Sequence, residues 1–176
     1  MTAGLRADSD LMIWRMSKDP KKLQDLSART LTAGMGTYFK PVRSFIGVCD
    51  AGHPQCGKKT SAAELKDSFG RYRYMVLHPV TKTRSWYAMP AEEREKVFSE
   101  RAEVLKRYGC INENFFSSYG IDGQEFLVQR EADDINDLIS VTQALREQRN
   151  KEYTACDTPL MLCIGRDLTE ILDLIS

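Results

Sequence analysis

Three residues with metal-ligand chemistry lie close together in a polar stretch of the chain. Cys49, His53 and Cys56 follow the spacing C-x3-H-x2-C, and thiolate and imidazole are ligands that zinc prefers. This spacing differs from that of the common zinc fingers, and Cys156 is a candidate for a fourth ligand. Two interpretations stay open: a small metal site, or an ordinary polar loop in which these side chains bind nothing.

A charged side chain also interrupts an apolar helical pattern. Val97, Arg101, Val104 and Tyr108 recur at i, i+4, i+7 and i+11, the spacing at which side chains share one face of a helix. Arg101 either lies at the edge of this face with its guanidinium in water, or projects into the protein interior. In the second case it is tolerated only if a negatively charged partner is buried with it.

The sequence around these residues predicts an alternating order of strands and helices. From residue 70 onward, the apolar periodicity and the Gly, Pro and Asp positions indicate strand, helix, strand, strand, helix, strand. This order is typical of the ferredoxin-like fold, an antiparallel sheet with helices on one face. The predicted strands are 70–80, 111–119, 125–130 and 159–164, and the predicted helices begin at Pro90, Asp133 and Leu168.

The N-terminal part repeats half of this order, because a strand at 10–16, a helix from Asp19-Pro20 and a strand at 38–48 give β-α-β. A half-unit leaves a sheet edge unpaired, so we expect a homo-oligomer to cover it. The prediction is an α+β protein of the dimeric α+β barrel type, with a partial ferredoxin-like unit (8–48), a loop or linker (49–69) and a complete β-α-β-β-α-β unit (70–176).

The overall composition excludes some classes of partner. Lys+Arg and Asp+Glu number 25 each, so the formal net charge is zero and no whole-chain field favours nucleic acid or anionic lipid. No apolar run is long enough for a membrane span, and residues 1–10 lack the apolar segment of a secretory signal. We therefore predict a cytoplasmic protein whose five cysteines are reduced thiols.

Several short motifs, occurring in order over nearly the whole chain from residue 8, resemble the chlorite dismutase-like family. That family includes chlorite dismutases and coproheme decarboxylases, so the resemblance implies haem b or coproheme as a possible cofactor. It also implies a further β-α-β segment at the start of family members, which we do not find here. The motifs are Asp10-Leu-Met-Ile-Trp14, Gly36-Thr-Tyr38, His78-Pro-Val-Thr-Lys-Thr-Arg-Ser-Trp-Tyr87, Pro90-Ala-Glu-Glu-Arg94, Tyr119-Gly-Ile-Asp-Gly-Gln-Glu-Phe126, Leu145-Arg146 and Asp157-Thr-Pro159.

Two residues that the resemblance places in the haem pocket depart from the family pattern. The family's histidine ligand of the haem iron falls on Arg101 when we count without gaps from Trp86, and arginine has no available lone pair for iron. The arginine that chlorite dismutases carry before the Gly-Ile/Leu-Asp turn falls on Glu113, which argues against chlorite decomposition. If no haem is bound, we expect Arg101 and Glu113 to pair across the cavity.

Three further positions match residues of the family's site. His78 replaces the catalytic tyrosine of one coproheme decarboxylase group and could act as an acid or base. Lys82 matches a lysine near the porphyrin propionates, and Trp86 matches a tryptophan that lines the haem pocket. The alternatives are a strand histidine that packs and hydrogen-bonds, a lysine in an exposed loop and a tryptophan of the core.

Three functions therefore stay open. The first is a haem- or porphyrin-binding, oxidoreductase-type family member with altered iron ligation. The second is a haem-free scaffold or partner subunit on the same fold, because a fold does not determine a function. The third is a small metal-binding or redox protein that uses the cysteine loop around His53.

Overall fold

The structure, a computed structural model, describes residues 2–6, 9–49 and 70–175. His53 and Cys56, two of the three residues in the suggested metal cluster, lie outside the described residues. In chain order the elements are β1 Thr2–Arg6, β2 Ser9–Met12, α1 Pro20–Thr32, the 3-10 helix η1 Gly34–Tyr38, β3 Tyr74–Lys82, α3 Arg84–Ala88, α4 Ala91–Arg107, β4 Asn112–Ser117, β5 Phe126–Ala132, α5 Ile135–Arg146, α6 Arg149–Glu152, β6 Thr154–Cys156, β7 Met161–Gly165 and α7 Leu168–Ile175.

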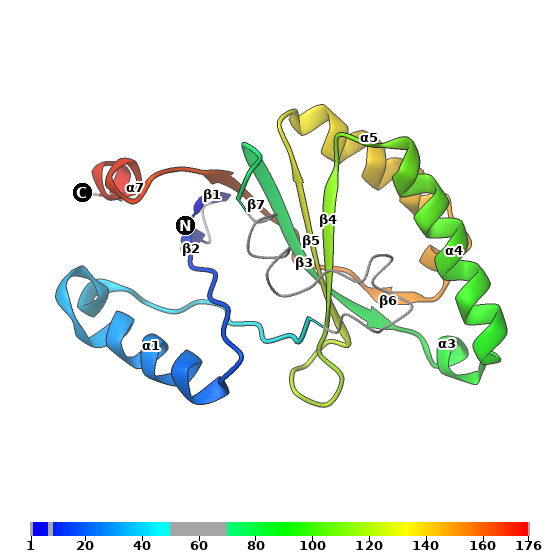
Figure 1. The fold of residues 1–176 in the computed structure, drawn as a ribbon, viewed down its shortest axis with the longest axis horizontal. Coiled ribbons are helices and arrows are strands. Elements are labelled where there is room, and N and C mark those ends of the chain that lie inside the picture. The colour runs from blue at the N-terminus through cyan, green and yellow to red at the C-terminus, as the bar shows by residue number, and fades with distance from the viewer. Residues whose placement is uncertain (1, 7–8, 50–69, 176) are drawn as a thin grey trace.

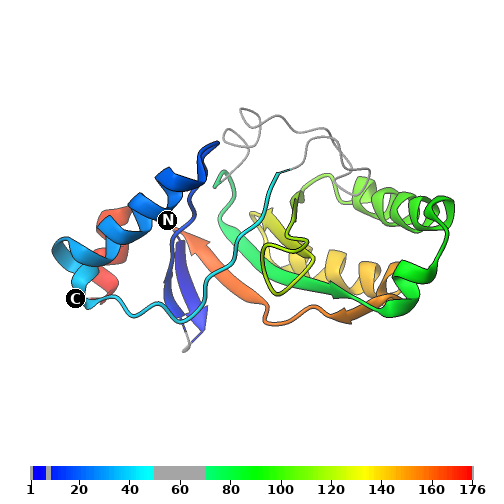
Figure 2. The same cartoon turned by 90° about the horizontal axis from the view of Figure 1, so that it is seen from below.

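The strands form one antiparallel sheet. Its strand order is β2-β1-β7-β3-β5-β4, and β6 pairs with the end of β3 outside this path. Helices α3, α4 and α5 lie at one end of the molecule and α1 and α7 at the other (Figures 1 and 2). The predicted α+β, ferredoxin-like architecture is therefore confirmed. None of the helices in the described part of the chain is both long and apolar enough to cross a membrane.

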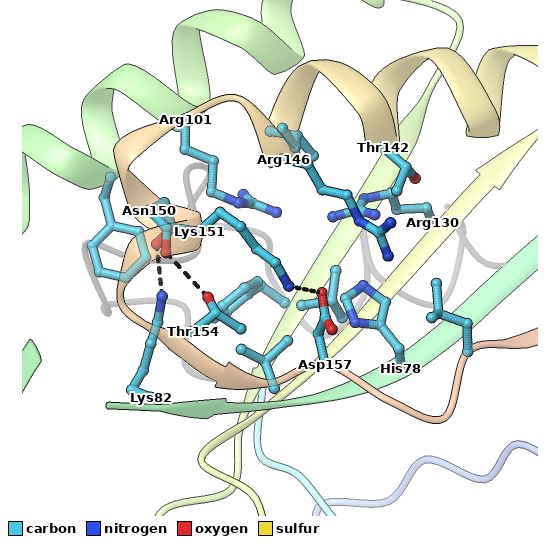
Figure 3. A pocket seen from close by; sticks show the side chains of 16 residues that line it. His78, Lys82, Arg101, Arg130, Thr142, Arg146, Asn150, Lys151, Thr154 and Asp157 are labelled. Atoms are coloured by element: carbon cyan, nitrogen blue, oxygen red, sulfur yellow. Dashed lines mark hydrogen bonds and ion pairs between the residues drawn. The ribbon is translucent and has the colours of Figure 1, made fainter. Parts of the chain in front are cut away.

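The two faces of the central strands have different neighbours, because successive side chains of a strand point to opposite faces. Leu77 of β3 packs with Phe116 and Leu127 of the adjoining strands, and Trp14 from the N-terminal segment covers this cluster. His78 points to the other face, toward the side on which α4 and α5 lie (Figure 3). The sheet therefore has an apolar face covered by the N-terminal segment and a mixed face covered by two helices.

Helix α4 begins directly after Pro90, as predicted, whereas α5 begins one residue later than predicted, with Asp134 and not Asp133 as its N-cap. Acidic residues occupy the first turn of α4 and basic residues its last turn, which suits the helix dipole. Asp134 caps α5 by accepting a hydrogen bond from the backbone N–H of Asn136. Val104 of α4 packs against Val141 and Leu145 of α5, so the apolar stripes of the two helices meet.

The predicted strand at 38–48 is not formed. Tyr38 ends a 3-10 helix, and the residues after it are extended but pair with the sheet only at Val48, opposite Ser117. Side chains replace a strand partner at Ile46, whose N–H donates to Asp122 and whose carbonyl accepts from Ser118. Because local apolar content cannot reveal such nonlocal side-chain bonds, the sequence overpredicted strand here.

Other differences concern short elements. The predicted strand at 10–16 is shorter, since β2 ends at Met12. The expected strand at 70–80 begins later and extends to Lys82, directly before the unpredicted helix α3. Strands β1 and β6 and helix α6 were also not predicted, and each has five residues or fewer, which leaves little periodicity to detect.

Candidate functional site

A small cavity lies between the mixed face of the sheet and helices α4 and α5 (Figure 3). Its volume is about 60 Å³. Apolar side chains such as Val80 and Phe115 form part of the wall. Its cationic lining consists of Lys82, Arg101, Arg130, Arg146 and Lys151, contributed by β3, α4, β5, α5 and α6.

One wall of the cavity is a buried ion network centred on Glu113. The Nη2 atom of Arg101 donates to the two carboxylate oxygens of Glu113 at 2.5 and 2.6 Å, and Nε of Arg130 donates to Oε2 at 2.6 Å. The three side chains are only 7–8% exposed. The ion pair expected between Arg101 and Glu113 is therefore formed, with Arg130 as a second partner.

The charge state of Glu113 follows from its partners. Burial alone would raise the pKa of this carboxyl group, but the positive charges of Arg101 and Arg130 and their hydrogen bonds lower the pKa to about 2. Glu113 is therefore ionised at neutral pH. Its single negative charge is shared by two guanidinium groups, so the network as a whole carries one excess positive charge.

His78 is buried in the cavity without hydrogen bonds. Its exposed fraction is 6%, and neither Nδ1 nor Nε2 has a hydrogen-bond partner among the described residues. Burial lowers the pKa of the imidazole to about 3, and the charge of Arg130 acts in the same direction. The structure thus places a neutral imidazole here, rather than the hydrogen-bonded strand histidine that the sequence allowed as an alternative.

Lys82 is buried and not in an exposed loop. Its Nζ donates to Oδ1 of Asn150 at 2.7 Å and lies 4.5 Å from the centre of the Trp86 ring, a cation–π arrangement. Burial lowers the pKa of the amine to about 7, assisted by the charge of Arg101. A sizeable fraction of Lys82 is therefore neutral at physiological pH, which is unusual for lysine.

Trp86 belongs to the core beside the cavity. It is 1% exposed, packs edge-on against Phe98 with ring centres 5.0 Å apart, and contacts Tyr153 at 5.8 Å. Trp86 is not among the residues that line the cavity. Its contact with the site runs through Lys82, whose amine lies over the ring.

The structure brings to the cavity four residues to which the sequence assigned no role in a site, although Arg146 and Asp157 belong to motifs of the family resemblance. Arg130, Arg146, Lys151 and Asp157 line it, and Lys151 donates to Asp157 at 2.6 Å (Figure 3). For Arg130 a signal existed, because it alternates with Phe126 and Val128 and so shares their face of β5. The other three lie near or beyond the end of α5, where no periodicity indicates direction.

The described residues do not form the metal site that the sequence suggested as one interpretation. Cys49 is half-buried and packs against the Leu77 cluster, whereas Cys156 is exposed with its thiol next to Thr158. Within residues 2–6, 9–49 and 70–175 no group of three or more His, Cys, Asp and Glu side chains could hold a metal ion. The proposal of a metal site thus rests on residues outside the described ranges.

Comparison with known proteins connects this arrangement to a family. The family model described as chlorite dismutase matches residues 1–166 of the chain. The chain belongs to the chlorite dismutase family. Coproheme decarboxylase of Mycolicibacterium smegmatis is 25% identical over 158 residues, which cover 89% of this chain and 67% of that protein.

Solved structures of the chlorite dismutase family share the fold. A crystal structure of a candidate chlorite dismutase has a TM-score of 0.86 and 26% identity, covering 99% of this chain and 78% of that chain. An arginine-to-glutamate variant of the chlorite dismutase of Candidatus Nitrospira defluvii gives 0.85 at 19% identity, with coverages of 98% and 76%. A haem-binding protein of Thermus thermophilus gives 0.84 at 18% identity, with coverages of 99% and 74%. The last two likenesses concern the fold alone.

Proposed function

We propose that this member of the chlorite dismutase family works without a histidine-ligated haem iron, as a ligand-binding or partner subunit, and that it does not decompose chlorite. The observation that carries the proposal is the buried network of Arg101, Glu113 and Arg130. Arg101 stands where the family resemblance calls for the iron-binding histidine, and a guanidinium offers no lone pair to a metal. Helix α4 contains no histidine at any position.

The size of the cavity supports the same proposal. Sites for organic ligands usually enclose several hundred Å³, whereas this cavity has about 60 Å³. A porphyrin could enter only if Arg101 and Glu113 separated, which would leave the buried guanidinium of Arg101 without its anion at a cost of several kcal/mol. The donors present therefore do not fit haem held as in the family, and we derive no chemistry through it.

A second candidate function is binding of haem b or coproheme with altered iron ligation. Two observations favour it: the two nitrogens of His78 find no hydrogen-bond partner in the residues that the structure describes, and the cavity lining is rich in cations that suit carboxylate groups. The names of the Mycolicibacterium and Thermus proteins point to coproheme and haem in those proteins. A titration with both compounds distinguishes the two candidates.

We expect no saturable Soret band when the purified native chain is titrated with haem or coproheme, since the ion network closes the cavity. Arg101→His breaks the network, shortens the side chain and offers an imidazole, so this variant should gain a band near one equivalent per chain. Absorbance in the Soret region is the measurement. Glu103→His is the matched control, because Glu103 lies on the same helix with a side chain that is 62% exposed.

The outcomes of this titration separate clearly. A saturable band with the native chain would favour the second candidate and contradict the first. A band with Arg101→His but not with Glu103→His would support loss of the cofactor through the change at residue 101. A band with both variants would point to nonspecific adsorption of haem to introduced histidines. In that case the titration of the native chain alone decides between the two candidates.

We further propose that a second copy of the chain covers the apolar segment 39–48. Val42, Ile46 and Val48 are 60%, 45% and 55% exposed, and exposed apolar patches of this kind mark interaction surfaces. Light scattering after gel filtration should give a mass of at least twice the 20.1 kDa chain. Ile46→Asp should shift the mass toward the monomer, whereas a monomeric native protein would contradict the proposal.

A further inference from the structure

The charges around the cavity do not balance. Five cationic side chains line it, and the carboxylates that pair with them are Glu113 and Asp157. Among the described residues, these charges leave an excess of three positive charges when Lys82 is protonated and of two when it is neutral. Grouped cations of this kind, partly removed from water, favour the entry of an anion.

His78 marks where such an anion would bind. A neutral imidazole has one N–H donor and one nitrogen acceptor, and at His78 neither has a partner within the described part of the chain. Burying two such atoms without hydrogen bonds is costly. In Figure 3 the guanidinium groups of Arg130 and Arg146 and the carboxylate of Asp157 converge on the side of the cavity where His78 lies.

The size and the donor set limit the anion. A cavity of about 60 Å³ holds roughly four to six water molecules, so the occupant is small. Guanidinium groups suit tetrahedral or planar oxyanions, and the carboxylate of Asp157 in the cavity wall calls for a ligand that can also donate. We propose that this cavity binds a small oxyanion that carries a hydroxyl group, with hydrogen phosphate as the simplest member of the class.

In this complex the oxyanion accepts from Arg130, Arg146 and the N–H of His78. Its hydroxyl donates to the carboxylate of Asp157, which lines the same cavity. Lys82 and Arg101 lie on the remaining side and add positive charge. The inference rests on the proposed function, because a porphyrin in the same cavity would displace a small anion.

Binding of the anion is expected to depend on pH through Lys82. The amine is faced by Arg101 of α4 and Lys151 of α6, which lower its pKa, and by Glu125 before β5, which raises it. Asn150 accepts its hydrogen bond. A bound anion stabilises the protonated amine, so its pKa rises from about 7 and the complex takes up protons near neutral pH. Phosphate itself takes up a proton between pH 8 and 6, whereas sulfate keeps its charge, so the affinity for sulfate is the readout of Lys82. It should increase as pH falls from 8 toward 6.

Isothermal titration of the full chain with inorganic phosphate tests the proposal. We expect saturable binding near one equivalent, with proton uptake detected by repeating the titration in buffers of different ionisation enthalpy. Sulfate has nearly the same size but no proton at neutral pH, so it should bind more weakly. Glycerol 3-phosphate distinguishes a free anion from the phosphoryl group of a larger molecule: binding of both assigns the site to phosphoryl groups, and binding of phosphate alone to the free anion.

Variants locate the site. His78→Leu should weaken phosphate binding about 10- to 100-fold, the loss typical of a hydrogen bond to a charged group, while His78→Gln keeps a donor and an acceptor and should retain most of the affinity. Arg146→Gln should also weaken binding. Arg107→Gln is the matched control, because Arg107 is an exposed arginine at the end of α4 that does not line the cavity.

The results decide between clear alternatives. Native binding that His78→Leu and Arg146→Gln reduce and Arg107→Gln leaves intact supports the site. If the native protein binds no phosphate and also gives no Soret band with haem or coproheme, the anion site alone is overturned. A Soret band with the native chain overturns the proposed function. Equal affinity for sulfate overturns the role given to the hydroxyl group. Thermal unfolding of each variant verifies that it is folded.

Discussion

Replacing Glu113 with glutamine is expected to lower the free energy of unfolding by about 3 to 5 kcal/mol. The side chain is 8% exposed and is the shared partner of Arg101 and Arg130. Without its charge, two buried guanidinium groups repel each other with no compensating anion. Urea unfolding followed by circular dichroism measures the change as a shift of the midpoint.

Arg101→Met should cost less than Glu113→Gln. In that variant Glu113 keeps its ion pair with Arg130, so no charge is left alone. The matched control is Glu103→Gln, which removes an exposed carboxylate that pairs with Lys106, and a change below about 1 kcal/mol is expected there. Equal losses for Glu113→Gln and Glu103→Gln would contradict a buried network.

The same network makes stability depend on acid. The pKa of Glu113 in the folded protein is about 2, against an ordinary value of 4.5, so folding is favoured by the ionised form. This contribution, on the order of 3 kcal/mol, is complete above pH 4.5 and is lost as pH falls toward 2. The difference in stability between the native chain and Glu113→Gln should therefore narrow over this range.

Trp86→Ala is expected to destabilise the protein by about 3 to 5 kcal/mol, as for other large core residues. The indole is 1% exposed and packs with Phe98 and Tyr153, while the amine of Lys82 lies over its ring. Removal of the indole leaves a cavity that the neighbouring side chains of β3, α3 and α4 fill only in part. Chemical unfolding again measures the loss.

Two controls bracket this result. Trp86→Phe keeps most of the apolar volume and should cost less than half as much as the alanine variant. Tyr38→Ala removes an aromatic residue that is 89% exposed, so its effect should stay within about 0.5 kcal/mol. A loss below 1 kcal/mol in Trp86→Ala would mean that the indole is dispensable for packing and would favour a role in ligand binding.

Sequence periodicity predicted which side chains share a face. The i, i+4, i+7 pattern placed Val97, Arg101 and Val104 together on one helix face, and all three are buried on α4. The same strand alternation accounts for the placement of Leu77 and His78 on opposite faces of β3. These features depend on helix and strand geometry alone, so they are local and readable without tertiary information.

Motif resemblance supplied one long-range contact that periodicity could not. Because Arg101 and Glu113 occupy positions on opposite walls of the family's cavity, their pairing was expected, and the structure forms it. The participation of Arg130 was not predicted. It depends on the strand register, in which Glu113 of β4 lies opposite Arg130 of β5. A one-residue slip would have turned that side chain to the other face.

The sequence by itself determined the α+β class, the helix faces and the alternation of strand side chains, because these follow from backbone geometry repeated over a few residues. Only the tertiary structure decided the depth to which each polar group is buried. Lys82 and His78 lie on a strand with no local sign of their burial, yet α4, α5 and α6 cover them and shift the pKa of each downward. The excess of positive charge in the cavity likewise arises from five elements that meet only in the folded chain. Exclusion of water there strengthens the electrostatic interactions between the charged groups.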